Sequence, residues 1–301
     1  MGGRRMRINE SASDRVFNTV NTVIVTILFL IVLYPLLYVV ACSISSPDKV
    51  GNGEIWLIPR GLNIEGYIRV FKEKNILIGY RNTLFYTVAG TVINLILTLP
   101  CAYALSKKDL VGRNLVMGFL MFTMYFSGGM IPSFLLVKKL GLYNSWLVML
   151  ILGAVSVYNV IISRTFFAGL PKDIEEAAFI DGCSVTRTFI QIVLPISKAL
   201  IGVMVLYYGV SHWNSYFNAM IYLIDDNKKP LQLFLRRILI TEEMNANMNA
   251  VVDDEMAAYA EYIKHLIKYS VIIVSSLPVL ILYPFLQRYF DKGVLIGSVK
   301  G

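Results

Sequence analysis

The sequence has little charge for its length. Only 16% of its 301 residues are Asp, Glu, Lys or Arg, whereas an average soluble domain has about 25%. Hydrophobic residues make up 56%, and the mean hydropathy is +0.62. This composition argues against a soluble globule, a disordered chain and a nucleic-acid-binding protein. It predicts a chain embedded in membrane lipid.

Metal-binding side chains are also scarce. The sequence has three cysteines, Cys42, Cys101 and Cys183, and two histidines, His212 and His265. The cysteines lie in or beside apolar segments and show no metal-ligand spacing, so we interpret them as small apolar residues. We therefore predict neither a metal site nor a disulfide scaffold.

Motifs for catalysis and for nucleotide binding are missing as well. The sequence has no G-x-x-x-x-G-K-[ST] phosphate loop, and it has no supported Ser-His-Asp, Cys-His or paired-carboxylate arrangement. Acidic residues gather in 225–268, but their spacing does not match a calcium-binding loop. We expect no catalytic residues, no cofactor bound by this chain and no enzymatic activity.

Long apolar runs are what the sequence does have. A bilayer core of about 30 Å requires roughly 20 helical residues. Six runs without Asp, Glu, Lys or Arg have about this length, and they predict an all-α polytopic membrane protein with six transmembrane helices: 19–42, 82–105, 114–137, 140–163, 199–224 and 269–286. The first run is longer than the 7–15 apolar residues of a signal peptide, so we expect it to be retained. Gly128 and Gly129, beside Pro132, mark the expected flexible point.

The basic residues favour cytoplasmic termini. Their raw number is equal on the two sides of the membrane, but long external loops are translocated despite their charge. The basic N-terminus and the short loop with Lys107, Lys108 and Arg113 then decide the orientation. The predicted organisation is a cytoplasmic N-terminus (1–18), a first transmembrane helix with an external loop (19–81), a five-helix core (82–288) that contains loops 170–195 and 225–268, and a cytoplasmic C-terminal tail (289–301).

Residues 170–195 predict a short helix, a turn and a second helix between the fourth and fifth runs. Asp173 is a candidate N-cap with Glu176 as its capping-box partner. Gly182 can provide a left-handed turn, and Pro195 suits the first turn of the next helix. The polar face begins with acids, which suits a protein partner better than an anionic membrane surface. We therefore predict a helix that docks on another protein.

This segment resembles the EAA loop of ATP-binding-cassette importer permeases. The matching residues are Glu176, Ala177, Ala178, Gly182, Ile192, Leu194 and Pro195. The resemblance extends to Asn82-Thr83-Leu84, to Trp213-Asn214-Ser215-Tyr216-Phe217 and to the ending FLQRYFDKGVLIGSVKG. Within the family, the sequence is most similar to the permeases of oligosaccharide importers, such as those for maltose, alginate and rhamnogalacturonan.

The resemblance implies a type I permease fold in a bacterial cytoplasmic membrane, with both termini in the cytoplasm. It implies five kinds of partner: a second homologous permease, two ATPase subunits that use ATP and magnesium, an extracytoplasmic solute-binding protein, an oligosaccharide substrate and membrane lipid. The loop helix would couple to the ATPase through Glu175, Glu176, Ala177, Ala178, Asp181 and Gly182.

Polar and aromatic residues in the apolar runs are candidates for the substrate path. Polar groups inside a bilayer are costly unless they face a bundle interior or a wet cavity, and aromatic rings stack well on sugar rings. The candidates are Tyr208, His212, Trp213, Asn214, Tyr216, Asn94 and Asn159. Structural packing, interhelical hydrogen bonding or an interfacial aromatic belt remains the alternative. An importer for a non-sugar solute and an ion-coupled carrier also remain open.

Overall fold

The computed structural model describes residues 11–249, 262, 265–281 and 283–284. This part of the chain consists of helices joined by turns and loops, with no strand. The all-α prediction is confirmed for this part of the chain. The chain divides into two compact units, one with residues 1–70 and 241–274 and the other with residues 71–240 and 275–301.

The first unit contains a long apolar helix and a small core. Helix α1 (Ala12–Ser43) begins with a capping box in which Ser11 and Asp14 each accept the other's backbone N–H. Its large apolar side chains are exposed along most of its length, as a helix in contact with lipid requires. After α1 come α2 (Pro47–Gly51) and α3 (Glu65–Lys72), and Cys42 and Val50 form part of the buried core.

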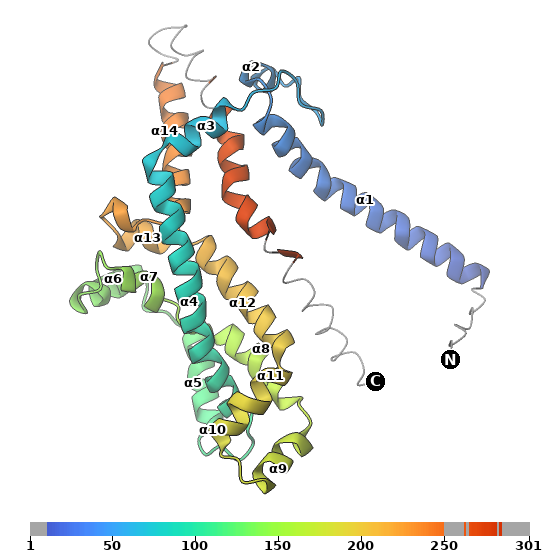
Figure 1. The fold of residues 1–301 in the computed structure, drawn as a ribbon, viewed down its shortest axis with the longest axis vertical. Helices are drawn as coiled ribbons and strands as arrows, with labels where there is room; N and C mark the ends of the chain where they lie inside the picture. Colours follow the sequence, from blue (N-terminus) through green and yellow to red (C-terminus); the bar gives the residue numbers. More distant parts are fainter. Residues whose placement is uncertain (1–10, 250–261, 263–264, 282, 285–301) are drawn as a thin grey trace. The chain divides into compact units, whose positions relative to one another are not determined.

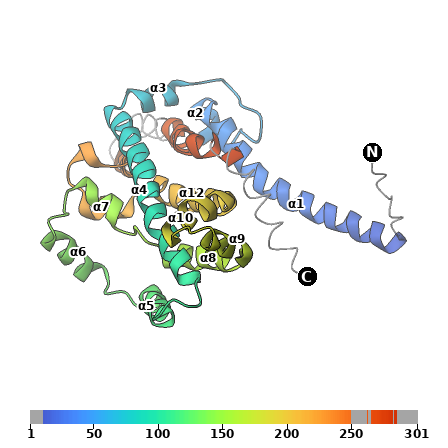
Figure 2. The same cartoon turned by 60° about the horizontal axis from the view of Figure 1, so that its bottom comes forward.

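The second unit is arranged around α4 (Lys74–Ser106), which packs on α12, α8 and α7 (Figure 1). In both views α6 and α12 lie on opposite sides of α4 (Figure 2). The other elements are α5 (Arg113–Tyr125), α6 (Met130–Lys139), α7 (Trp146–Ile151), α8 (Val157–Ala168), α9 (Lys172–Ile180), α10 (Val185–Thr188), a π-helix (Phe189–Val193), α11 (Leu194–Ile196), α12 (Lys198–Trp213), α13 (Phe217–Tyr222), a 3-10 helix (Asp226–Lys228) and the first part of α14 (Leu231–Asn249). From Thr241 on, the residues of α14 belong to the first unit.

The count of six spans is not confirmed. Among the described residues, α1 and α4 are each long and apolar enough to cross a membrane. Two bent pairs raise this number to at most four: α5 with α6, at an angle of 113°, and Val185–Ile196 with α12, at 83°. The helical stretch His265–Ile281 is apolar but shorter. The prediction counted each charge-free run as one spanning helix, and several runs are divided into separate helices.

The breaks have local causes in the backbone. The third run breaks between α5 and α6, where Gly129 has a φ of +83°. The fourth run breaks between α7 and α8, where Gly153 has a φ of +79° and Ser156 caps α8. Only glycine adopts such left-handed backbone readily. The first of these breaks falls at the glycine pair that the sequence marks as the expected flexible point.

The polar residues that open the second run hold a distant loop. The Asn82 amide donates to the carbonyls of Asn227 and Lys229 at 2.8 and 2.9 Å. The Thr83 hydroxyl accepts the backbone N–H of Leu231 at 2.8 Å, and both side chains are fully buried. These two side chains therefore hold the backbone of residues 227–231 against the first turns of α4.

Candidate functional site

Helix α9 begins two residues earlier than the predicted N-cap at Asp173 would place it. Its first residue is Lys172 and its N-cap is Pro171, with no side-chain cap. The predicted N-cap role of Asp173, with Glu176 as its capping-box partner, is therefore wrong. Pro171 has an extended backbone that already directs the chain into the helix, and it places Asp173 in the first turn. In the first turn the negative carboxylate of Asp173 still stabilises the helix, because it lies near the positive end of the helix dipole.

A glycine turn ends α9. Gly182 has a φ of +79°, so the predicted left-handed conformation is confirmed. The backbone N–H of Gly182 donates to Phe179 and that of Cys183 donates to Ala178, which satisfies carbonyls at the end of the helix. Ser184 then caps α10 by accepting the backbone N–H of Arg187.

The predicted coupling residues divide between two faces of this segment. Ala178 is only 4% exposed, and the Glu175 carboxylate forms an ion pair with Lys107 at the end of α4. Glu176 and Ala177, by contrast, are exposed. The exposed face also carries Ile180, which is 86% exposed.

The exposed face of α9 is thus both acidic and apolar, and Asp181 and Gly182 at its end are exposed as well. An isolated chain gains nothing by presenting Ile180 to water, since such exposure forfeits the free energy of apolar burial. The combination suits a concave protein surface that offers cations and apolar contacts. The motif resemblance did not include Ile180, although its position before Asp181 places it on the segment that is predicted to dock.

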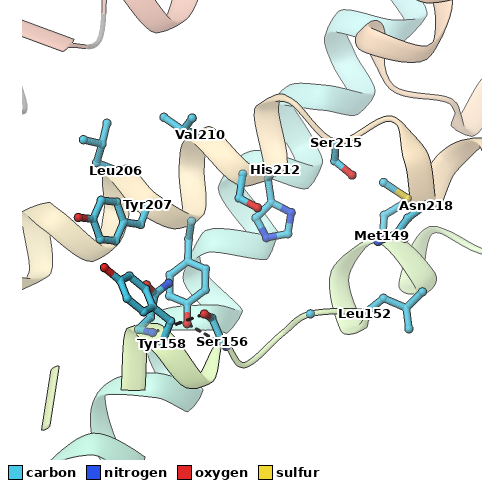
Figure 3. A pocket seen from close by; sticks show the side chains of 14 residues that line it. Met149, Leu152, Ser156, Tyr158, Leu206, Tyr207, Val210, His212, Ser215 and Asn218 are labelled. Atoms are coloured by element: carbon cyan, nitrogen blue, oxygen red, sulfur yellow. Dashed lines mark hydrogen bonds between the residues drawn. The ribbon is translucent and has the colours of Figure 1, made fainter. Parts of the chain in front are cut away.

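A pocket of about 620 Å³ lies between α12 and the α7–α8 region (Figure 3). Three predicted path residues line it, namely Asn159, Tyr208 and His212. The lining also includes residues outside the predicted set: Met149, Leu152, Gly153, Ser156, Tyr158, Leu206, Tyr207, Val210, Ser211, Ser215 and Asn218. None of the lining residues is Asp, Glu, Lys or Arg, so the pocket offers hydroxyl, amide, imidazole and aromatic groups without a permanent charge.

A hydrogen-bonded chain holds one wall of the pocket. The Asn94 amide donates to the carbonyls of Gly153 and Ala154, at 3.2 and 2.7 Å. Its Oδ1 lies 2.7 Å from Nε2 of His212. Asn94 therefore joins α4 and α12 to the break between α7 and α8. It lies behind the pocket, in contact with the lining residues.

Two further contacts place the side chains of α12. The Tyr208 hydroxyl lies 2.7 Å from Oγ1 of Thr98 and accepts the backbone N–H of Ser156 at 3.3 Å. Gly90 leaves room for the imidazole of His212, because a Cβ at that position would lie 2.4 Å from Nε2. These contacts fix Tyr208 and His212, whereas Tyr207 remains 41% exposed on the pocket side of α12.

Three predicted path residues lie outside this pocket. Trp213 is buried, and its indole N–H donates to the Ser275 carbonyl at 3.0 Å. The Asn214 amide donates to the carbonyl of Val210 within α12. The ring of Tyr216 lies 4.9 Å from the guanidinium of Arg236. For Trp213 the arrangement agrees with the packing alternative.

Comparisons with known proteins place these features in a family. The family described as "Binding-protein-dependent transport system inner membrane component" matches residues 76–296. The chain is 36% identical to the protein LplC of Bacillus subtilis (strain 168) over 98% of each chain. It is 40% identical to YtcP of the same organism, a polygalacturonan/rhamnogalacturonan transport system permease, over 90% of this chain and 94% of the relative.

A solved structure agrees with this match. A chain in the crystal structure of a bacterial ABC transporter that imports the acidic polysaccharide alginate aligns with a TM-score of 0.81 and 36% identity. The alignment covers 93% of this chain and 99% of the other.

Proposed function

This chain belongs to the family of binding-protein-dependent transport system inner membrane components, and from that premise we propose that it forms half of the translocation pathway of an ATP-driven oligosaccharide importer. The family consists of transport subunits and not of enzymes. The observation that carries the proposal is the exposed acidic and apolar face of α9, directly before the Gly182 turn. That face is where an ATPase subunit docks.

The ATPase contact involves the exposed part of the coupling segment. Glu176, Ala177, Ile180 and Asp181 point away from the chain's own core. Burial of Ile180 in an ATPase cleft would stabilise the complex by about 1.5–3 kcal/mol. ATP and magnesium bind to the ATPase subunits, and this chain converts the movement of those subunits into opening and closing of the pathway.

The substrate class follows from the relatives and from the pocket. The names of YtcP and of the alginate transporter refer to polysaccharide uptake. The pocket here combines tyrosine rings with hydroxyl and amide groups, which is the usual set for sugar rings and their hydroxyls. Tyr158 and Tyr207 are exposed in the single chain, and we assign the opposite wall to a second, homologous permease. A solute-binding protein delivers the sugar from outside, and both termini lie in the cytoplasm of a bacterial cell.

Affinity purification tests this assignment. The tagged chain is extracted from its native membrane in mild detergent, and the co-purifying proteins are identified by mass spectrometry. We expect a second permease, an ATPase and a solute-binding protein. Recovery of the chain alone, with uptake in liposomes that requires no ATP, would instead support an ion-coupled carrier.

Tyr207→Ala is expected to weaken sugar uptake through the pocket. Loss of one stacking ring should raise the apparent KM for uptake about tenfold, the equivalent of about 1.4 kcal/mol. Tyr216→Ala is the matched control, because it removes the same ring from a position outside the pocket. Uptake kinetics of a radiolabelled oligosaccharide measure both variants. Equal KM values for the two would contradict the role of the pocket.

A further inference from the structure

The coupling helix is attached to α4 by an ion pair. Nζ of Lys107, the residue directly after α4, contacts the carboxylate of Glu175 in α9. The Glu175 side chain is 14% exposed and that of Lys107 is 28% exposed. A pair that is this far removed from water is screened less than a surface pair. Glu175 is therefore engaged within its own chain, in contrast to the exposed Glu176.

Aromatic packing holds the lysine in place. Nζ of Lys107 lies 4.3 Å from the centre of the Tyr103 ring. That ring stacks on Phe189 at 4.8 Å and meets Phe167 edge-on at 5.7 Å. The cation–π contact and the stacked rings restrict where Lys107 can lie. The ion pair consequently has a defined position relative to α4, α8 and the π-helix.

Helix α4 also contacts the pocket wall. Asn94, which holds the break between α7 and α8, lies in α4, about 20 Å before Lys107 at the rise of an α-helix. The helix is continuous from Asn94 to Ser106, directly before Lys107, although Pro100 lies inside it. A displacement of α9 that pulls on Lys107 therefore acts on one end of a continuous helix, which contacts the pocket wall through Asn94.

We propose that Lys107 and Glu175 are positioning residues that transmit the movement of α9 to α4, and through Asn94 to the pocket. This inference rests on the proposed docking of α9 to an ATPase. It assigns the two adjacent glutamates different tasks: Glu176 contacts the ATPase, and Glu175 connects the docked helix to its own transmembrane core.

Charge reversal tests the link in the complete importer. Lys107→Glu and Glu175→Lys each place like charges in contact, and each is expected to lower uptake about tenfold. The variants should still co-purify with the ATPase and hydrolyse ATP, but the stimulation of hydrolysis by substrate-loaded binding protein should be lost. The double variant K107E/E175K restores the attraction and should recover most of the uptake. Lys108→Glu, the same change at the exposed neighbour, is the control.

Other outcomes would overturn the inference. Normal uptake by both single variants would show that the pair transmits nothing. Loss of ATPase binding in Glu175→Lys alone, without rescue by Lys107→Glu, would place Glu175 in the ATPase contact. A variant that fails to insert is replaced by Lys107→Met or Glu175→Gln, which remove the attraction without creating repulsion. If no ATPase co-purifies with the wild-type chain, the proposed docking of α9 on an ATPase is itself contradicted. Loss of co-purification in the variants alone does not contradict that docking.

Discussion

Gly182→Val is expected to abolish uptake while the chain remains inserted in the membrane. Gly182 has a φ of +79°, a conformation that costs an L-residue about 1–2 kcal/mol and a β-branched residue more. The open space around its Cα means that the cost comes from the backbone and not from a clash. The turn would relax toward negative φ and change the direction of α9 relative to α10. Uptake in whole cells and membrane-fraction immunoblots measure the two effects.

Gly182→Asn is the matched variant for this experiment. Asparagine adopts the left-handed region more readily than other non-glycine residues, so uptake should be reduced but retained. Gly182→Ala should fall between the two. Equal activity of the valine and asparagine variants would contradict the conformational explanation, and full activity of both would remove the turn from the mechanism.

Glu176→Lys is expected to lower uptake by about a hundredfold or more, because it reverses a charge at the centre of the proposed ATPase contact. Glu176 is exposed, and the described part of the chain supplies no ion-pair partner for it. The folding of this chain should therefore be insensitive to the change, whereas ATPase association should be lost. Co-purification of the ATPase with the tagged permease distinguishes these two consequences.

The control for Glu176→Lys is Asp109→Lys, which makes the same charge change at an exposed loop position outside α9. Uptake by this control should stay close to that of the wild type. Glu176→Gln, which removes the charge without reversing it, should give an intermediate loss. Retention of the ATPase by Glu176→Lys, with normal uptake, would move the docking site away from the exposed face of α9.

Much of the coupling segment could be predicted from the sequence because its signals are local. The positive φ at Gly182 agrees with a glycine turn, and the acids and small residues before it agree with a short helix. The docking of that helix on another protein stays a prediction. The start of α9 could not be predicted as reliably. Asp173 and Pro171 both suit the beginning of a helix, and the structure favours Pro171.

The pocket was only partly predictable because its walls are distant in the chain. Tyr208 and His212 are unusual in an apolar run, and this made them visible in the sequence. Nothing in the sequence marks Ser156 and Tyr158 as pocket residues. They line the pocket because the chain breaks at Gly153. Trp213 is equally conspicuous in the sequence, but its hydrogen bond to Ser275 lies outside the pocket.

The sequence by itself determined the class of the protein, the helical content, and the short helix and glycine turn within residues 170–195. Each of these depends on composition or on residues within about one or two helical turns of each other. The tertiary structure alone decided which glutamate faces outward, where the apolar runs break and which side chains share a pocket. Those properties depend on contacts such as Lys107 with Glu175 and Asn94 with Gly153. These contacts join residues about 60 positions or more apart, and local periodicity carries no information about such pairs.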